Sequence, residues 1–175
     1  MDQIEMAEKL VVIAGIMIAV FFDWKARRIP NWLTFSLLVI GLLFHTWAHG
    51  WAGFGQSAAG FAAGIFFLFI PFAFGGVGGG DVKLMGAIGS LVGAGLVFKI
   101  FLATAIFGGI FSLLEMIQRK AVRKTLKRIR DLLVYVALTK RIPPEETAKA
   151  QGLHIPYAFA IGCGTLFVLC VMGGG

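Results

Sequence analysis

Two aspartates have surroundings that call for a chemical explanation. Asp23 directly follows an apolar run in FFDWKARRIPNWLT, and Asp81 closes the glycine-rich stretch GGVGGGDVKL. Ionisable residues next to membrane-length apolar segments are costly and are therefore functional candidates. Two neighbouring carboxylates can share one proton, so that one activates a water while the other polarises a carbonyl and protonates the leaving amine. Such a pair could hydrolyse a peptide bond without a metal or a nucleophilic side chain.

Each aspartate also has a purely structural explanation. Asp23 could form an interfacial ion pair with one of the basic residues that follow it, Lys25, Arg27 or Arg28. Asp81 could cap the helix that begins there and favour its positive dipole end. For Asp23 taken alone, the structural explanation is the stronger one.

Capping does not explain the glycines before Asp81, which are Gly75, Gly76, Gly78, Gly79 and Gly80. Glycine at membrane depth is useful where the backbone must approach another backbone or a ligand closely. We expect this segment to let an extended substrate strand lie beside Asp81.

Two further polar residues flank the aspartates. Pro30-Asn31 predicts a turn, with Asn31 as the N-cap of the following helix. Lys83 either extends to the membrane surface as an ordinary basic residue, or supports the carboxylates and recognises substrate; the sequence leaves both open.

The sequence predicts neither a metal site nor a cofactor. The three histidines, His45, His49 and His154, form no metal-ligand pattern, and no pair of C-x-x-C motifs is present. The two cysteines, Cys163 and Cys170, are expected to be small packing residues.

Composition indicates that lipid surrounds most of the fold. Of the 175 residues, 58% are hydrophobic and 14% are charged, with a mean hydropathy of +0.87. Soluble domains have about a quarter charged residues. The apolar runs lack the alternation of a membrane β-barrel, so we predict an all-α membrane protein.

About six transmembrane helices can be placed along the chain. They are predicted at Ile4–Phe22, Trp32–Ala48, Ala58–Phe74, Val82–Phe98, Ile100–Ile117 and Ile155–Met172. Because lysine and arginine accumulate on the cytoplasmic side, both termini should lie outside and both aspartates should lie toward the cytoplasm. Only Lys9 and Lys99 of the 16 basic residues then fall on the other side.

Glycines within these segments are spaced for close helix packing. Gly60 and Gly64, and likewise Gly89 and Gly93, are four residues apart. Small residues at this spacing let helix backbones approach each other in membranes.

We predict a single membrane-embedded domain, residues 1–175, with a basic cytoplasmic segment at about 118–153. Within it, residues 119–141 have apolar residues on one helical face and basic residues on the other. Such a helix suits the anionic membrane surface. Nucleic-acid binding has only the charge in its favour, so anionic lipid headgroups are the expected partners.

Three motifs in this order resemble the GxGD aspartic proteases of membranes, and specifically the type IV prepilin peptidase family. Gly78-Gly79-Gly80-Asp81 matches G-x-G-D, and Lys83 matches the lysine two residues later. Asp23, followed by Arg27 or Arg28 and then IPN, looks like the first-aspartate motif. HIPYAFAIG is similar to the last-span motif of the small peptidases of Flp/Tad pilus systems, with Ala158 in place of the usual glycine.

The resemblance implies an intramembrane aspartic endopeptidase of the bacterial inner membrane. It implies cleavage of prepilin or pseudopilin precursors at the cytoplasmic face, after the glycine that ends a short basic leader. Asp23 and Asp81 inherit the catalytic roles, and Gly78, Gly79, Gly80, Lys83 and Asn31 are supporting or substrate-binding candidates.

Two other functions remain open at this point. A small transporter could use Asp23 and Asp81 to bind cations or relay protons, with the glycines breaking a helix. An archaeal preflagellin peptidase would belong to the same protease superfamily.

Overall fold

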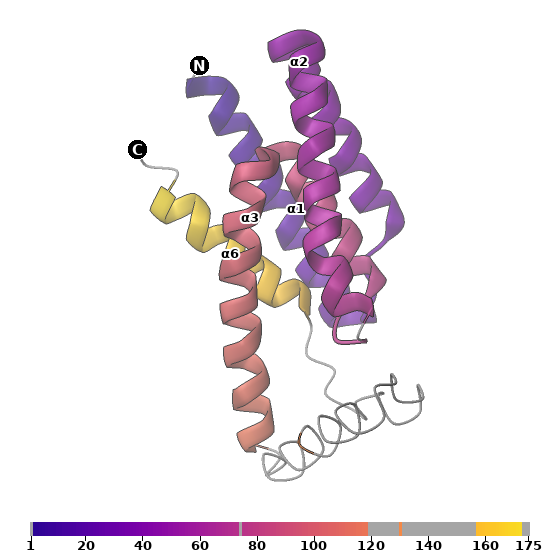
Figure 1. Cartoon of the computed structure of the whole chain (residues 1–175), viewed down its shortest axis with the longest axis vertical. Helices are drawn as coiled ribbons and strands as arrows, with labels where there is room; N and C mark the ends of the chain where they lie inside the picture. Colours follow the sequence, from indigo (N-terminus) through magenta and orange to yellow (C-terminus); the bar gives the residue numbers. More distant parts are fainter. Residues whose placement is uncertain (1, 74, 119–129, 131–156, 173–175) are drawn as a thin grey trace.

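The computed structural model describes residues 2–73, 75–118, 130 and 157–172. Within these ranges the elements are helices: α1 (Asp2–Ala26), α2 (Asn31–Ala73), α3 (Gly79–Gln118) and α6 (Tyr157–Met172) (Figure 1). No strand occurs in this part of the chain. The all-α prediction is confirmed.

α2 and α3 each consist of two helices that meet at a glycine. Gly50 has φ 61° and ψ −143°, and Gly93 has φ 79° and ψ 170°. Positive φ is accessible to glycine at little cost. α2 folds back on itself at Gly50, because Gly41 before the break and Gly60 after it both lie against residues 89–90 of α3 (Figure 1).

These breaks correct two predicted boundaries. The sequence predicted a connection between Ala48 and Ala58, whereas the helix is interrupted only around Gly50. It also placed a turn between Phe98 and Ile100, whereas the break lies at Gly93. Apolar periodicity cannot locate a single-residue break, because the flanking residues stay helical and apolar.

The glycine spacing is confirmed in part. A Cβ on Gly60 would overlap the backbone carbonyl of Gly89, and one on Gly64 would overlap that of Met85. Backbone contact of this kind needs residues without side chains. Gly93 also takes part in this close approach, because a Cβ on Gly60 would stand 3.0 Å from its Cα, but it forms the break in α3 as well and has open space where its own Cβ would stand.

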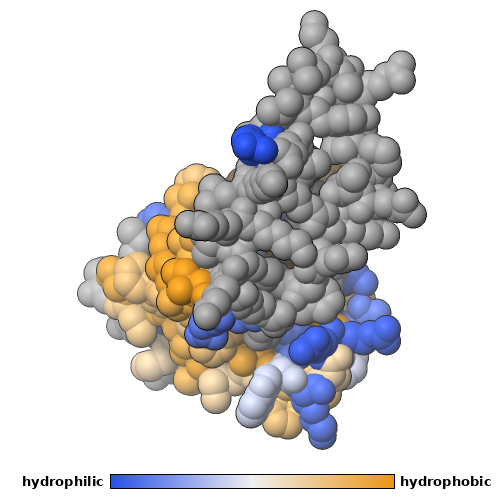
Figure 2. All heavy atoms as spheres, turned by 90° about the horizontal axis from the view of Figure 1, so that it is seen from below, coloured by the Kyte–Doolittle hydropathy of each residue, from blue (hydrophilic) through white to orange (hydrophobic). Residues whose placement is uncertain are grey.

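Much of the described surface is apolar. Large hydrophobic side chains are exposed along every described helix, including Met17 on α1, Leu43 on α2, Ile106 on α3 and Phe167 on α6. α2 and residues Gly79–Glu115 of α3 are long and apolar enough to cross a membrane. Figure 2, which views the lower end of Figure 1, shows the hydrophilic residues mainly at one edge of the coloured surface. The chain therefore has the surface of a membrane protein.

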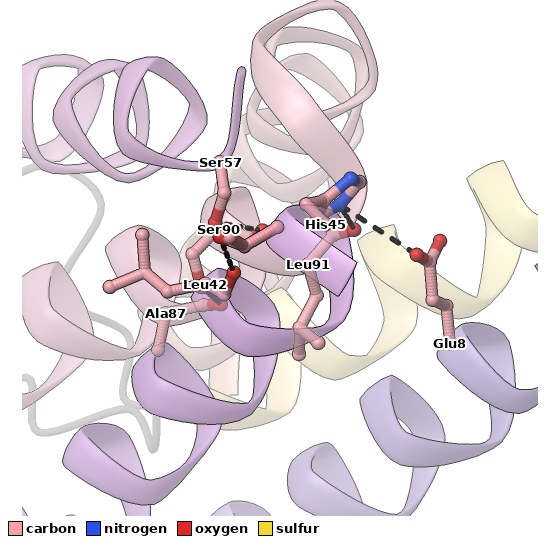
Figure 3. Close-up of polar contacts among 8 residues, drawn as sticks. Glu8, Leu42, His45, Ser57, Ala87, Ser90 and Leu91 are labelled. Carbon is pink, nitrogen blue, oxygen red and sulfur yellow. Dashed lines mark hydrogen bonds and ion pairs between the residues drawn. The ribbon is translucent and has the colours of Figure 1, made fainter. Parts of the chain in front are cut away.

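Polar contacts join three helices around the breaks (Figure 3). His45 Nε2 lies 2.7 Å from the carbonyl oxygen of Leu91, so this nitrogen carries the proton and donates. The same nitrogen is 3.8 Å from a carboxylate oxygen of Glu8 on α1. The Ser57 hydroxyl donates to the carbonyl of Ser90 at 2.7 Å. Because Leu91 lies just before the break at Gly93, His45 binds a carbonyl where the helical hydrogen-bond ladder is interrupted.

The predicted amphipathic helix at residues 119–141 lies outside the described residues, apart from Arg130, which is exposed. The rest of the basic segment, at about 118–153, also lies outside them from residue 119 on. Its predicted contact with anionic lipid therefore stays a prediction.

Candidate active site

Asp23 lies in the last turn of α1, which extends beyond the predicted end at Phe22 to Ala26. The Arg27 N–H donates to the Asp23 carbonyl at 2.8 Å, and Arg27 adopts φ 49°. A single residue in this left-handed conformation closes the helix and turns the chain. Arginine there is strained relative to glycine, but its charge acts favourably on the Asp23 carboxylate.

The first glycines of GGVGGGD end α2. The Gly76 N–H donates to the Pro71 carbonyl at 2.9 Å, and the Gly75 N–H donates to the Phe72 carbonyl at 2.9 Å. With Gly75 at φ 72°, this is the Schellman arrangement of helix C-termini. Gly75 thus has a local structural explanation.

The last glycines begin α3. The Asp81 N–H donates to the Gly78 carbonyl at 3.1 Å, while the Gly78 N–H donates to Asp81 Oδ2 at 3.2 Å. Asp81 therefore stands inside the first turn and binds back to the N-terminus, as in a capping box. Asp81 thus caps the helix as predicted, and this contact uses only one of its two carboxylate oxygens.

Two contacts join the start of α3 to the segment between α1 and α2. A Cβ on Gly80 would stand 3.3 Å from Cβ of Ile29, so a larger residue would crowd this approach. Lys83 Nζ donates to Asn31 Oδ1 at 3.0 Å, at an exposed position. The Asn31 side chain thus binds Lys83 rather than forming the predicted N-cap, and Lys83 reaches the start of α2 rather than the carboxylates.

The N-terminus of α6 completes the site. The Ala158 N–H hydrogen-bonds the Asp23 carboxylate, and the Asp81 carboxylate acts electrostatically on Tyr157. Ala158 is fully buried, so its methyl group is accommodated where the family motif has glycine. The surrounding motif, HIPYAFAIG, is visible in the sequence, but it gives neither residue a role because it does not say which helix ends lie next to α6.

The structure brings Asp23 and Asp81 together. The charge of Asp23 acts directly on Asp81, although 58 positions separate them in the chain. Asp81 is only 9% exposed, and Asp23 is half-buried. Asp23 Oδ2 and Asp81 Oδ1 are buried and have no hydrogen-bond partner among the described residues. Buried polar atoms are nearly always paired, so an unpaired oxygen on each of two interacting carboxylates indicates a site suited to a water or a polar substrate group.

An apolar groove of about 580 Å³ runs beside this site, between α1 and α6. Its walls include Ile13, Val20, Phe21 and Trp24 of α1 and Phe159 and Gly162 of α6. Phe21 and Trp24 flank Asp23 in sequence, and Phe159 follows Ala158. The groove therefore reaches the end of α1 and the start of α6, and no carboxylate or basic side chain of the described residues lines it.

No group of three or more metal-ligating side chains occurs among residues 2–73, 75–118, 130 and 157–172. The chemistry available in this region is that of two carboxyl groups, one phenol and backbone N–H groups. This set is typical of hydrolysis by a carboxylate-activated water.

The fold and the site together are those of an all-helical, apolar protein with a buried pair of carboxylates at its helix ends. Comparison with known proteins gives the family. Residues 10–113, more than half of the chain, match the type IV leader peptidase family, and the chain belongs to that family. A curated relative, the preflagellin peptidase of Methanocaldococcus jannaschii, is 34% identical over 82 residues. That alignment covers 45% of this chain and 35% of the relative, so the chain spans about a third of its length. No solved structure matches significantly.

Proposed function

We propose that this protein is an aspartic endopeptidase of the GxGD type that removes the leader from type IV prepilin-like precursors. The observation that carries the proposal is the buried pair of Asp23 and Asp81, each with one unpartnered oxygen among the described residues. Family membership supports a peptidase over a transporter.

In the proposed reaction the two carboxyl groups share one proton. The ionised one takes a proton from water as the oxygen attacks the scissile carbonyl carbon. The protonated one donates a hydrogen bond to the carbonyl oxygen and then gives its proton to the leaving nitrogen as the C–N bond breaks. The catalytic water would bind between the two carboxyl groups, at the oxygens that have no partner among the described residues, Asp23 Oδ2 and Asp81 Oδ1.

We further propose that the chain crosses the bacterial inner membrane six times as one domain, residues 1–175. The crossings would be α1, the two halves of α2, the two halves of α3, and α6. The asymmetry of lysine and arginine supports an orientation with the aspartates at the cytoplasmic face and both termini outside. In the same proposal, the segment at 118–153 rests on anionic headgroups.

The proposed substrates are prepilin or pseudopilin precursors, including those of Flp pilus systems, on the resemblance of the three motifs. The archaeal relative is called a preflagellin peptidase, which makes preflagellin-like precursors the second candidate. Both classes would be cut by the same two carboxylates, so the substrate is a separate question from the chemistry.

The test is cleavage of a co-expressed precursor by wild type, Asp23→Asn and Asp81→Asn. Wild type should release the leader, and each variant should lose at least about 10³-fold in rate, because a single remaining carboxyl cannot serve as both acid and base. Glu8→Gln is the matched control: it neutralises another carboxylate of α1, at the His45 end of the helix, and should leave cleavage intact.

Cleavage that persists in a folded Asp23→Asn or Asp81→Asn variant would overturn the assignment. Parallel expression with a prepilin and with a preflagellin separates the two substrate classes. Ion flux through reconstituted vesicles, abolished by the same substitutions in a chain that cleaves neither precursor, would favour the transporter.

A further inference from the structure

The apolar groove between α1 and α6 has no part in the two-carboxylate reaction as described so far. Its walls form one stripe along each helix, at the spacing of residues that share a helical face. The stripes are Ile13, Ile16, Met17, Val20, Phe21 and Trp24 on α1, and Phe159, Gly162, Cys163 and Leu166 on α6. Within the described residues no charged side chain lies in these walls. An occupant of the groove would therefore be apolar.

The floor of the groove is the place where α1 and α6 approach each other. A Cβ on Gly162 would stand 3.1 Å from Cγ2 of Ile16 and 3.4 Å from Cγ2 of Val20. Ile16 is buried, whereas Met17 on one side and Leu166 on the other are exposed. Because a close helix contact lies between exposed side chains, the groove is open along its length and can be entered from the surrounding lipid.

Both stripes lead to the end of the groove at which Asp23 lies. Asp23 comes seven residues after Ile16 and three after Val20, so it continues the same face of α1. On α6, Ala158 directly precedes Phe159, and its N–H binds the Asp23 carboxylate. The groove is therefore continuous with the part of the site that holds Asp23.

The size of the groove suits a length of membrane helix. Ile13 and Trp24 are eleven positions apart, which is about 16 Å along α1 and about half of the hydrocarbon thickness of a bilayer. The groove volume of about 580 Å³ is within the range of roughly 300–1,000 Å³ of ligand sites. A peptide segment that enters lipid is apolar and helical, because lipid offers no partner for its backbone. Such a segment matches the groove in chemistry and in length.

We infer that this groove is the docking surface for the apolar membrane segment of the precursor, which packs along α1 and α6 and brings the peptide bond at its end to the acid pair. This inference rests on the proposed peptidase function. Lipid acyl chains fill the groove when no precursor is bound, so docking exchanges lipid contacts for close side-chain packing. Phe21, Trp24 and Phe159 favour that exchange, because aromatic side chains dominate the energetics of packed interfaces.

Photo-crosslinking tests where the precursor lies. A benzophenone amino acid replaces Met17 in the groove or Leu43 of α2, which is outside it. The two side chains are 66% and 65% exposed, so both meet lipid equally. The full-length Asp81→Asn protein, which should keep the precursor uncut, is co-expressed with the precursor that wild type cleaves, a prepilin or a preflagellin. We expect crosslinks to the precursor from position 17 and none from position 43.

Crosslinks from position 17 to lipid alone, or to a second copy of this chain, would overturn the inference. Equal crosslinking of the precursor from both positions would do so as well. Cleavage by wild type and its loss in the aspartate variants are measured separately, so the groove can fail while the peptidase stands. A wild type that cleaves neither precursor would refute the proposed function, and this inference with it.

Two cysteines of α6 provide a matched pair of substitutions. Cys163 lines the groove, whereas Cys170 is exposed on the same helix outside the groove walls. An indole at position 163 would occupy the groove, so Cys163→Trp should raise KM about 10-fold with kcat unchanged, as expected when substrate binding is lost away from the reacting atoms. Cys170→Trp should keep the wild-type KM and kcat. A wild-type KM in folded Cys163→Trp would overturn the inference, and if that variant does not fold, the crosslinks from position 17 decide.

Discussion

Each carboxylate of the pair accepts a hydrogen bond from the N-terminus of a helix. Asp81 accepts from Gly78 at the start of α3, and Asp23 accepts from Ala158 at the start of α6. Helix N-termini stabilise negative charge by about 0.3–1 kcal/mol, and by about 2 kcal/mol in partly buried sites. These contacts offset part of the cost of burying two acids, and they hold each carboxylate by one oxygen while the other stays available.

Lys83 and Asn31 act at a distance from the acids, and we expect modest effects from changing them. Their hydrogen bond is exposed, and such a bond contributes about 1 kcal/mol, or about 5-fold in rate. Lys83→Met and Asn31→Ala should therefore each lower kcat/KM by less than about 10-fold. The double variant should lose no more than either single one, because both remove the same contact.

Cleavage kinetics of the three variants beside Asp81→Asn test this. A loss above about 100-fold for Lys83→Met, with little loss for Asn31→Ala, would mean that Lys83 contacts substrate directly. That result would restore the recognition role that the sequence left open.

At the scale of elements, glycines have three different structural roles in this fold. Gly50 and Gly93 break helices, Gly75 closes one, and Gly60 admits the backbone of another helix. Only the last role requires that the residue has no side chain where another backbone lies. The sequence spacing alone does not distinguish these roles, because Gly89 and Gly93 have the same spacing as Gly60 and Gly64.

Alanine at position 60 should destabilise the fold, and alanine at position 95 should not. A methyl group at position 60 would overlap the Gly89 carbonyl, and such overpacking costs about 1–3 kcal/mol. Gly95 lies in the second half of α3 with open space around it, so alanine there should be neutral or stabilise by up to about 1 kcal/mol through helix propensity. Thermal unfolding in one detergent compares them. Equal midpoints for the two variants would contradict the backbone contact between α2 and α3.

At the scale of the whole molecule, exposed tryptophans lie near both ends of the first half of α2. Trp24 and Trp32 lie at the end of α1 and the start of α2, whereas Trp47 and Trp51 flank the break at Gly50. The helix between Trp32 and Trp47 is about 22 Å long at 1.5 Å per residue. Tryptophans separated in this way suit the two interfaces of a bilayer.

Labelling from the two sides of the membrane tests the proposed orientation. In a background of Cys163→Ser and Cys170→Ser, we expect Trp51→Cys to react with an impermeant maleimide on cells with a permeable outer membrane. Lys25→Cys should react only after the inner membrane is opened. Both positions are exposed, so access to the reagent rather than burial decides the outcome. Reaction of both from the same side would contradict the orientation.

Much of the site could be predicted from local sequence. Asp23 and Asp81 stand out because carboxylates next to apolar runs need a reason, and GGGD signals an unusual helix start. The hydrogen bond from the Ala158 N–H to Asp23 could not be predicted in this way. A backbone donor leaves no trace in residue type.

The sequence by itself determined the helical class, the apolar surface and which two acids are candidates for the chemistry, because these follow from hydropathy and from the cost of charge beside lipid. Tertiary structure alone decided that the two acids act on each other, that α6 supplies a backbone donor, and that the breaks fall at Gly50 and Gly93. The physical reason is that contacts between α1, α3 and α6 depend on how helix backbones approach. That approach is set by packing between distant segments, which no local pattern encodes.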